Sequence, residues 1–316
     1  MKVVTVMVPC YNEEESLPSL FQRLDSLVAR SDEDIEYRLL FVDDGSSDST
    51  RKELRSYVDE HDYAQYIFLS RNFGKEKAMY AGIERVSTDA LVIIDADLQD
   101  PPELIPEMVL LWKQGYEDVY ARRRSRKGES WLKKFTSHLY YALLQKLTTV
   151  KIQADTGDFR LLDSKCIESL RMLTETERNS KALFSWIGFK KIEFLYDRDE
   201  RIAGKSKWNY YQLIKLAIDG ITSFTVAPLR IVTYIGSGVS IVALIYAAYI
   251  LVNTFVNGID VPGYASLIIC ILFLGGIQLL GLGIIGEYLG RVFMQTKNRP
   301  NYLVEEEKLY KSKLEE

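Results

Sequence analysis

Two carboxylates stand close together in the segment Ile93-Ile94-Asp95-Ala96-Asp97-Leu98. The apolar run from Ala90 to Ile94 predicts a short buried strand, and side chains two residues apart in an extended segment point to the same side. Asp95 and Asp97 could therefore converge on one hard divalent cation, which prefers oxygen ligands and leaves positions open for substrate phosphates. Open α/β sheets bind their ligands at the ends of such strands.

Polar residues also follow two apolar runs nearer the N-terminus. They occur in Val8-Pro9-Cys10-Tyr11-Asn12-Glu13 and in Val42-Asp43-Asp44-Gly45-Ser46-Ser47. At the ends of strands an aromatic ring and a carboxylate can bind a base and a ribose, although the same residues can serve only as helix caps. The three cysteines and two histidines show no metal-ligand spacing, so we expect any metal to be held by oxygen.

The elements that must position these residues alternate along the first half of the chain. We predict strands at residues 3–8, 39–42, 66–69 and 91–94, and helices at residues 16–29, 49–60, 75–86 and 103–114. Such alternation predicts an α/β domain with a mainly parallel sheet and helices on both faces, and we place it at residues 1–208. The net charge of −4 argues against a nucleic-acid binder.

The C-terminal third has a different composition. Ile231–Val256 and Val261–Gly286 contain no charged residue. As helices these segments would reach roughly 39 Å, against about 30 Å of hydrocarbon in a bilayer. We predict two transmembrane helices, at residues 231–256 and 261–289, preceded by an interfacial helix at 209–229 and followed by a cytoplasmic tail at 290–316.

The flanking charges predict the orientation in the cell membrane. Asn257–Asp260, between the two apolar segments, lacks Lys and Arg, whereas Arg230 precedes the first and Arg291, Lys297 and Arg299 follow the second. By the positive-inside rule both termini and the upstream domain are cytoplasmic. Glycines of the second span, including Gly286 and Gly290, predict close helix packing within the hairpin or between subunits, and we expect a homo-oligomer.

A basic segment lies between these regions. Residues 122–134 contain seven Lys or Arg and one acid, Glu129, and apolar residues follow at helical spacing. We predict an amphipathic helix on the anionic membrane surface at about 122–147, with a solvated loop beside a core helix as the alternative. Its arginines could gather the phosphate of a lipid acceptor; these are Arg122, Arg123, Arg124 and Arg126.

In combination, the N-terminal motifs resemble the nucleotide-sugar-dependent family 2 glycosyltransferases, whose catalytic domain has the GT-A (Rossmann-like) fold. Further motifs are similar to those of polyprenyl-phosphate (undecaprenyl, or bactoprenol) glycosyltransferases, and the catalytic part resembles dolichyl-phosphate mannose synthase. They are Ser70–Lys75, Asp97–Glu103, Thr156–Leu161, Arg201–Lys207, Gly286–Arg291 and Arg299–Tyr302. The resemblance covers nearly the whole chain.

The resemblance implies a role for each matching residue. Pro9, Tyr11, Glu13 and Asp44 would line a uridine pocket. Asp95 and Asp97 would bind Mg²⁺ or Mn²⁺ and the diphosphate, and Asp97 would act in catalysis. Basic residues would also meet the donor, namely Lys75, Arg201, Lys205 and Lys207. Asp158 would face the acceptor, as a base or as a metal or water ligand, and Asp155 is the alternative.

The activity implied is transfer of a hexose from a UDP-sugar, or from a GDP-sugar, to polyprenyl phosphate, with inversion, for modification of cell-envelope glycans. A processive polysaccharide synthase is an alternative, but the Gln-x-x-Arg-Trp motif and the further spans of that class are missing from the sequence. A membrane-anchored nucleotide-sugar sensor is a second alternative. A dinucleotide-dependent oxidoreductase is disfavoured because no Gly-x-Gly-x-x-Gly follows the first predicted strand.

Overall fold

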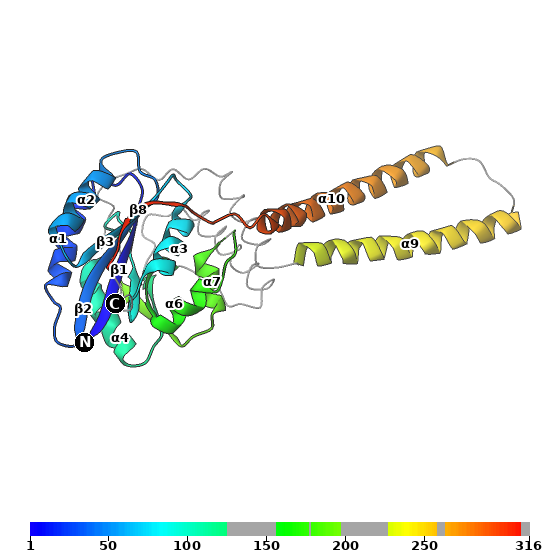
Figure 1. Cartoon of the computed structure of the whole chain (residues 1–316). Helices are drawn as coiled ribbons and strands as arrows, with labels where there is room; N and C mark the ends of the chain where they lie inside the picture. The colour runs from blue at the N-terminus through cyan, green and yellow to red at the C-terminus, as the bar shows by residue number, and fades with distance from the viewer. Residues whose placement is uncertain (125–155, 177, 197–226, 258–262, 311–316) are drawn as a thin grey trace. The chain divides into compact units, whose positions relative to one another are not determined.

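The computed structural model describes residues 1–124, 156–176, 178–196, 227–257 and 263–310 (Figure 1). The chain forms two compact units, each treated separately below. The first comprises Met1–Asn209 and Arg299–Glu316, and the second comprises Tyr210–Asn298.

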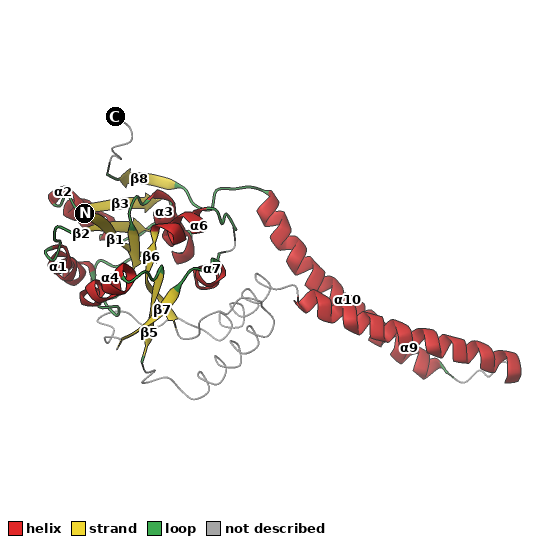
Figure 2. Ribbon diagram, turned by 90° about the horizontal axis from the view of Figure 1, so that it is seen from below, coloured by secondary structure: helices red, strands yellow, loops and turns green. Residues whose placement is uncertain are grey.

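A mixed sheet forms the first unit (Figure 2). Its strands in the described residues are β1 (Lys2–Cys10), β2 (Ile35–Asp43), β3 (Ala64–Leu69), β4 (Ala90–Ile93), β5 (Asp118–Arg123), β6 (Thr156–Asp163), β7 (Lys191–Tyr196) and β8 (Val304–Lys308). Their order is β7-β5-β6-β4-β1-β2-β3-β8. Strand β1 pairs in parallel with β2 and β4, and β2 pairs in parallel with β3. Strand β6 runs antiparallel to β4 and β5, and β8 runs antiparallel to β3.

Helices cover both faces of this sheet. They are α1 (Leu17–Val28), α2 (Thr50–Glu60), α3 (Lys75–Arg85), α4 (Ile105–Lys113), α6 (Ser164–Arg171) and α7 (Ser180–Trp186), with a 3₁₀ turn η1 at Pro102–Leu104. Apolar residues of α1, α2 and α4 join one core with Val4, Val6 and Val8 of β1. On the opposite face, Gly82 of α3 lies so close to Met7 that an added Cβ would be 2.1 Å from the Met7 sulfur.

The central strand shows why the sheet is built in this order. All residues from Val4 to Val8 are buried, as expected for a strand with helices on both faces. Pro9 lacks an N–H, yet it is tolerated because β1 pairs with β4 only from Val4 to Met7. The strands that follow β1 are added to the sheet in two opposite directions, since β2 lies on one side of β1 and β4 lies on the other. Such a switch point is where open α/β sheets bind ligands.

The predicted α/β architecture is confirmed, and each of the four predicted strands and helices of the first half is present within a few residues. Two strands of the sheet differ from the sequence analysis. Arg122 and Arg123 belong to strand β5, so the basic segment does not begin as a helix. Residues 304–308, which we assigned to a tail, form an edge strand of the sheet.

The second unit contains two long helices, α9 (Ala227–Asn257) and α10 (Tyr264–Thr296). Both are long and apolar enough to cross a membrane, over Pro228–Ile250 and Phe273–Thr296. Large apolar side chains along both helices are exposed in the protein alone, among them Leu244 and Leu282. Their exposure fits a lipid environment, because soluble proteins rarely expose apolar surface on this scale.

The glycines of α10 contribute to packing at one described point. A Cβ on Gly281 would lie 3.2 Å from Val232 of α9, so this glycine permits the two helices to approach closely. At the other glycines of α10 an added Cβ would have nothing within 4 Å in the part of the chain that the structure describes. Among the residues that the structure describes, Gly281 is therefore the glycine of α10 at which the two helices approach each other closely.

Candidate functional site

Four loops meet at the carboxyl ends of the central strands. They follow β1, β2, β3 and β4, whose parallel pairing places these ends at one edge of the sheet. Strand β6 runs the opposite way beside β4, so its first residues reach the same edge. The sequence-predicted site residues that the structure describes, apart from the arginines near residue 122, come from these segments or lie directly beside them, as Pro9 at the end of β1 and Lys75 at the start of α3 do.

The loop after β2 is held by two buried aspartates. Asp43 accepts hydrogen bonds from the backbone N–H of Gly45 (3.0 Å) and Ser46 (3.1 Å). Asp44 accepts from the N–H of Phe73 (2.7 Å) and of Gly74 (2.9 Å), which lie in the loop after β3. Burial raises the pKa of Asp44, and these two amides oppose that rise. Asp44, predicted to contact uridine, thus fastens one loop of the site to another.

Gly45 allows these two loops to approach. Its φ of +75° lies in the left-handed region, and an added Cβ would be 2.3 Å from the backbone carbon of Arg71 and 2.4 Å from the nitrogen of Asn72. No side chain larger than hydrogen fits there without moving the backbone. The close approach lies just before α3, whose N-cap is Gly74.

The loop after β1 is bound to the loop after β2 by side chains. Ser46 Oγ accepts a hydrogen bond from Asn12 N (2.9 Å), and Thr50 Oγ1 accepts one from Glu13 N (2.9 Å). The carboxylate of Glu13 accepts a hydrogen bond from Ser16 Oγ at 2.7 Å. Tyr11 remains 47% exposed. Its ring is thus accessible to a planar ligand group, and the role in binding uridine stays a prediction.

Lys75 forms the electrostatic centre of the site. Its Nζ lies 2.5 Å from Asp95 Oδ1 and 2.5 Å from Asp158 Oδ2, although Asp95 follows β4 and Asp158 belongs to β6. Burial favours the neutral form of Lys75, but the two carboxylates outweigh it and raise the pKa of the amine. Burial likewise opposes ionisation of Asp158, but Lys75 and other cations hold the pKa of this carboxyl below its ordinary value.

The Asp95/Asp97 pair is not arranged as the sequence analysis assumed. Strand β4 ends at Ile93, and Ala96–Asp97 form a turn, followed by Leu98 at a φ of +60°. Asp97 Oδ1 accepts a hydrogen bond from Gln99 N at 3.2 Å, which closes the turn. The argument from alternating sides of an extended segment was therefore wrong, and Asp95 shares its cation with Asp158.

More distant contacts anchor the loop that carries this turn. Arg23 of α1 donates to both carboxylate oxygens of Glu103, at 2.8 and 2.6 Å. The buried Asp100 accepts a hydrogen bond from Tyr196 OH at 2.7 Å. These bonds hold the loop at points beyond Asp97. The position of Asp97 is therefore set by the surrounding fold as well as by its own turn.

A buried cation that the sequence analysis missed lies beside Asp158. Arg160 is fully buried two residues further along β6, on the same side of the strand. Its Nη1 lies 3.3 Å from Asp118, its guanidinium stacks 4.0 Å from the Phe184 ring, and its Nε and Nη2 have no hydrogen-bond partner among the described residues. The motif Thr156–Leu161 was the available signal, but an arginine in a strand does not reveal burial.

The remaining predicted residues fall into two groups. Arg122 donates to Glu193 of β7 at 2.8 Å, and the backbone N–H of Arg124 donates to Tyr196. Arg123 lies between them at the end of β5. The others lie outside the described residues, namely Arg126, Asp155, Arg201, Lys205 and Lys207, together with the interfacial segment before α9 and most of the predicted amphipathic helix.

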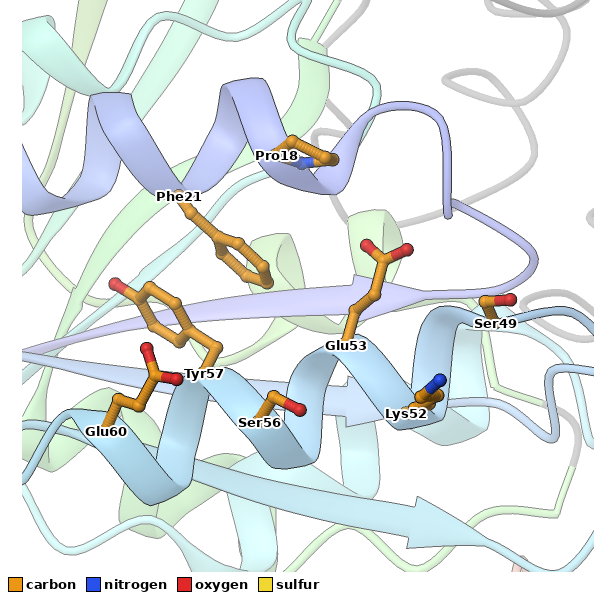
Figure 3. A pocket seen from close by; sticks show the side chains of 8 residues that line it. All are labelled: Pro18, Phe21, Ser49, Lys52, Glu53, Ser56, Tyr57 and Glu60. Carbon is orange, nitrogen blue, oxygen red and sulfur yellow. The ribbon is translucent and has the colours of Figure 1, made fainter.

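A groove of about 450 Å³ lies elsewhere, between α1 and α2 (Figure 3). Phe21 and Tyr57 face each other there and stack with their ring centroids 4.0 Å apart. Glu53 and Lys52 line its other end. None of the predicted site residues that the structure describes lines this groove, which we therefore separate from the site.

The carboxylates of the site fit a divalent cation that is completed by substrate. Asp95 and Asp158 already approach one positive charge together, and Asp158 Oδ1 is buried without a hydrogen-bond partner among the described residues. No cluster of three or more His, Cys, Asp or Glu suited to a metal occurs in the part of the chain that the structure describes. Mg²⁺ commonly uses only one or two carboxylates plus substrate phosphates, so two acidic residues suffice.

The arrangement combines features that suit transfer from an anionic donor. The exposed aromatic ring of Tyr11 follows β1, and a lysine lies next to carboxylates that can hold a cation. A phosphate leaving group gains negative charge as it departs, and positive charge placed beside it stabilises the transition state.

Comparison with known proteins gives matches over both units. Residues 5–171 match Glycosyl transferase family 2, and residues 227–292 match the GtrB C-terminal hairpin. An uncharacterized glycosyltransferase of Synechocystis sp. is 48% identical over 95% of this chain and 94% of its own. The bactoprenol glucosyl transferase of Shigella phage SfV is 39% identical over 96% and 99%, and a prophage bactoprenol glucosyl transferase homolog of Escherichia coli is 40% identical over 95% and 98%.

Substitution of Gly45 by alanine tests the contact between the loops after β2 and β3. We expect the free energy of unfolding to fall by about 2 kcal/mol or more, since left-handed strain adds to a clash with backbone. For a domain of this size that corresponds to a Tm lower by about 4–8 °C. Gly115→Ala is the matched control, because Gly115 has a φ of +91° but no atom within 4 Å of an added Cβ. Equal losses in the two variants would reject the contact.

Substitution of Lys75 by methionine tests the shared charge through the pH dependence of stability. Asp158 has a lowered pKa, so its contribution is present above the ordinary value of 3.8 and is lost as the pH falls through the folded-state pKa. Without Lys75 the pKa of Asp158 rises, and we expect the acid-side loss of stability to begin at higher pH. Tm measured against pH in chelator-containing buffer checks this, with Lys113→Met as the control because Lys113 pairs with the exposed Asp34. Identical pH profiles for wild type and Lys75→Met would contradict the assignment.

Proposed function

This chain belongs to glycosyltransferase family 2 and has its GT-A fold, and from that premise we propose that it transfers a hexose from a nucleotide sugar to a polyprenyl phosphate at the cytoplasmic face of a membrane. One observation carries the proposal. The likeness to the bactoprenol glucosyl transferase of the phage extends through both the catalytic sheet and the apolar hairpin, over 96% of this chain.

The acceptor accounts for the combination of the two units. A polyprenyl chain cannot leave the bilayer, because each buried CH₂ contributes about 0.8 kcal/mol. Its phosphate must therefore be met at the level of the lipid head groups by an enzyme held there. The two long apolar helices supply such an anchor. Arg230, Arg291 and Lys297 at their outer ends favour a cytoplasmic active site.

The donor pocket is assigned to the loops after β1 and β2. Tyr11 offers an exposed ring to the base, and Pro9 and Glu13 flank it along the chain. Asp44 supports the pocket from beneath through its bonds to Phe73 and Gly74. We favour UDP as the carrier, with GDP as the alternative.

The diphosphate is assigned to the loops after β3 and β4. A divalent cation would be held there by Asp95 and Asp97, and when bound it would neutralise charge on the departing nucleoside diphosphate. Lys75 lies against Asp95 and would supply a second positive charge to the departing nucleoside diphosphate. Arg201, Lys205 and Lys207 are further candidates for phosphate contacts.

Asp158 has the properties of a charge-holding group more than those of a base. Its pKa is below the ordinary value, and a carboxylate with a lowered pKa accepts a proton less readily. The acceptor does not require a strong base either, since a phosphate monoester has its second pKa at about 6 and is largely dianionic at neutral pH. We assign Asp158 to holding the cations of the site, with Asp155 as the alternative acceptor-facing residue.

The proposed reaction is a single displacement at the anomeric carbon. A phosphate oxygen of the lipid forms a bond to this carbon as the bond to the nucleoside diphosphate breaks, and the electron pair of that bond leaves with the diphosphate. Attack from the side opposite the leaving group inverts the configuration.

A transfer assay tests the proposed function. The purified full chain in vesicles with undecaprenyl phosphate is incubated with labelled UDP-glucose, UDP-N-acetylglucosamine, UDP-galactose or GDP-mannose and with Mg²⁺ or Mn²⁺, and then extracted with organic solvent. We expect label in the lipid phase with at least one donor, loss of label on chelation, and roughly 10²- to 10³-fold slower transfer by Asp97→Asn. No lipid label with any donor would favour a nucleotide-sugar sensor, and full activity after chelation would exclude the metal.

Charge reversal tests whether the arginines near residue 122 meet the acceptor. We expect Arg124→Glu and Arg126→Glu to raise the KM for polyprenyl phosphate roughly tenfold, with little change in the KM for the nucleotide sugar, because a basic residue near an anionic surface contributes about 1 kcal/mol. Lys52→Glu is the control, since Lys52 is an exposed basic residue beside the separate groove on α2. Equal effects on both substrates would reject this role.

A further inference from the structure

The segment that follows the apolar hairpin returns to the catalytic sheet. Strand β8 pairs antiparallel with β3, with Ile67 opposite Glu307 and Phe68 opposite Glu306, and Ser70 N donates to Leu303 O at 2.9 Å (Figure 2). Just before the strand, Tyr302 is buried against α3, where its hydroxyl donates to Glu84. The strand therefore covers an edge that would otherwise be open, as protein sheets often require.

Three consecutive glutamates of β8 each meet a different arginine. Glu305 pairs with Arg51 at 2.8 Å, Glu306 with Arg55 at 2.5 Å, and Glu307 with Arg85 at 2.8 Å. Arg51 and Arg55 belong to α2, and Arg85 is the last residue of α3. Although all three pairs hold the strand, one of them reaches further into the protein.

Arg51 connects the strand to the loop after β2. Its Nε donates to Asp43 Oδ2 at 2.6 Å, its Nη1 donates to Glu305 at 2.8 Å, and its Nη2 donates to the carbonyl of Leu69 at the end of β3. Asp43 is fully buried and is the residue that accepts from Gly45 N and Ser46 N. We call Asp43, Arg51 and Glu305 the Arg51 bridge.

We propose that Arg51 is a positioning residue for the donor nucleotide, and that Glu305 of the C-terminal strand holds it in that position. Within the Arg51 bridge, Arg51 holds Asp43 in place. Asp43 in turn accepts hydrogen bonds from the backbone of Gly45 and Ser46. The side chain of Ser46 then binds the backbone of Asn12, which is next to Tyr11. The strand after the hairpin is thus part of the donor site. This inference rests on the proposed function for the identity of the donor, but the geometry of the loop can be tested without it.

The size of the expected effect follows from exposure. Glu305 is 55% exposed, so its ion pair is screened by water and contributes a factor of at most about five to an equilibrium. Asp43 has no exposure, so loss of the Arg51 guanidinium would leave a buried carboxylate short of a partner. Glu305 is accordingly the residue to change for a clean measurement, and Arg51→Lys is the stronger variant that keeps the charge.

The test compares Glu305→Gln with Glu306→Gln in the full chain in lipid vesicles. The two substitutions remove the same charge from neighbouring positions of one strand, but Glu306 binds Arg55 and Tyr66 and is outside the Arg51 bridge. We expect Glu305→Gln to raise the KM for the nucleotide sugar about two- to fivefold, with kcat and the KM for polyprenyl phosphate unchanged. Arg51→Lys should give the same pattern with a larger rise, Glu305→Asp should restore most of the affinity, and Glu306→Gln should leave the KM for the donor unchanged.

Backbone hydrogen exchange of residues 43–48 provides the second readout, because it needs no substrate. We expect faster exchange in Glu305→Gln and Arg51→Lys, and wild-type exchange in Glu306→Gln. Equal effects of the two glutamate substitutions, or unchanged exchange and unchanged KM in Glu305→Gln, would overturn the inference. If wild type transfers no sugar, the proposed function fails, while the exchange measurement still decides whether the Arg51 bridge positions the loop.

Discussion

Lys75 lies between two carboxylates that come from different parts of the sheet, Asp95 after β4 and Asp158 on β6. Two such carboxylates would repel each other without a cation, and the burial of Asp158 makes the need for positive charge stronger. The loops of the site serve this requirement. Gly45 lets the loop after β3 approach, Asp44 fastens it, and α3 then begins at Lys75 with its amine directed to the carboxylates.

The second constraint is the covalent order of the chain. The apolar hairpin lies between β7 and β8 in the sequence, yet β8 belongs to the same sheet as β1–β7. The catalytic unit is therefore joined to the hairpin at both ends of the latter. The strand that follows the hairpin thus belongs to the same sheet as the strands that carry the candidate site.

Local pattern was sufficient for much of the fold and part of the site. Buried strands and amphipathic helices have distinct periods, so the first four strands and helices could be placed from sequence, as could the two long apolar helices. Asp95, Asp158 and Lys75 were predicted through motifs, and the structure brings their side chains together. The extended backbone assumed for Asp95 and Asp97 was not found, because the strand ends at Ile93 and a turn follows at Ala96–Asp97. Arg160 was missed, since burial of a cation depends on Phe184 and Asp118, which are distant in the chain.

The sequence by itself determined the α/β class, the family and the apolar hairpin, and it predicted the segments of the candidate site, because each of these depends on residues that are neighbours in the chain. The tertiary structure decided which charges meet. Lys75 reaches Asp158 across 83 residues, and Arg51 reaches Glu305 across 254. Glu305 lies in a short charged stretch without alternating apolar residues, so nothing local marks it as a strand. This stretch forms a strand because the edge of β3 provides backbone hydrogen-bond partners and the arginines beside it provide opposite charge. Both exist only after the chain has folded.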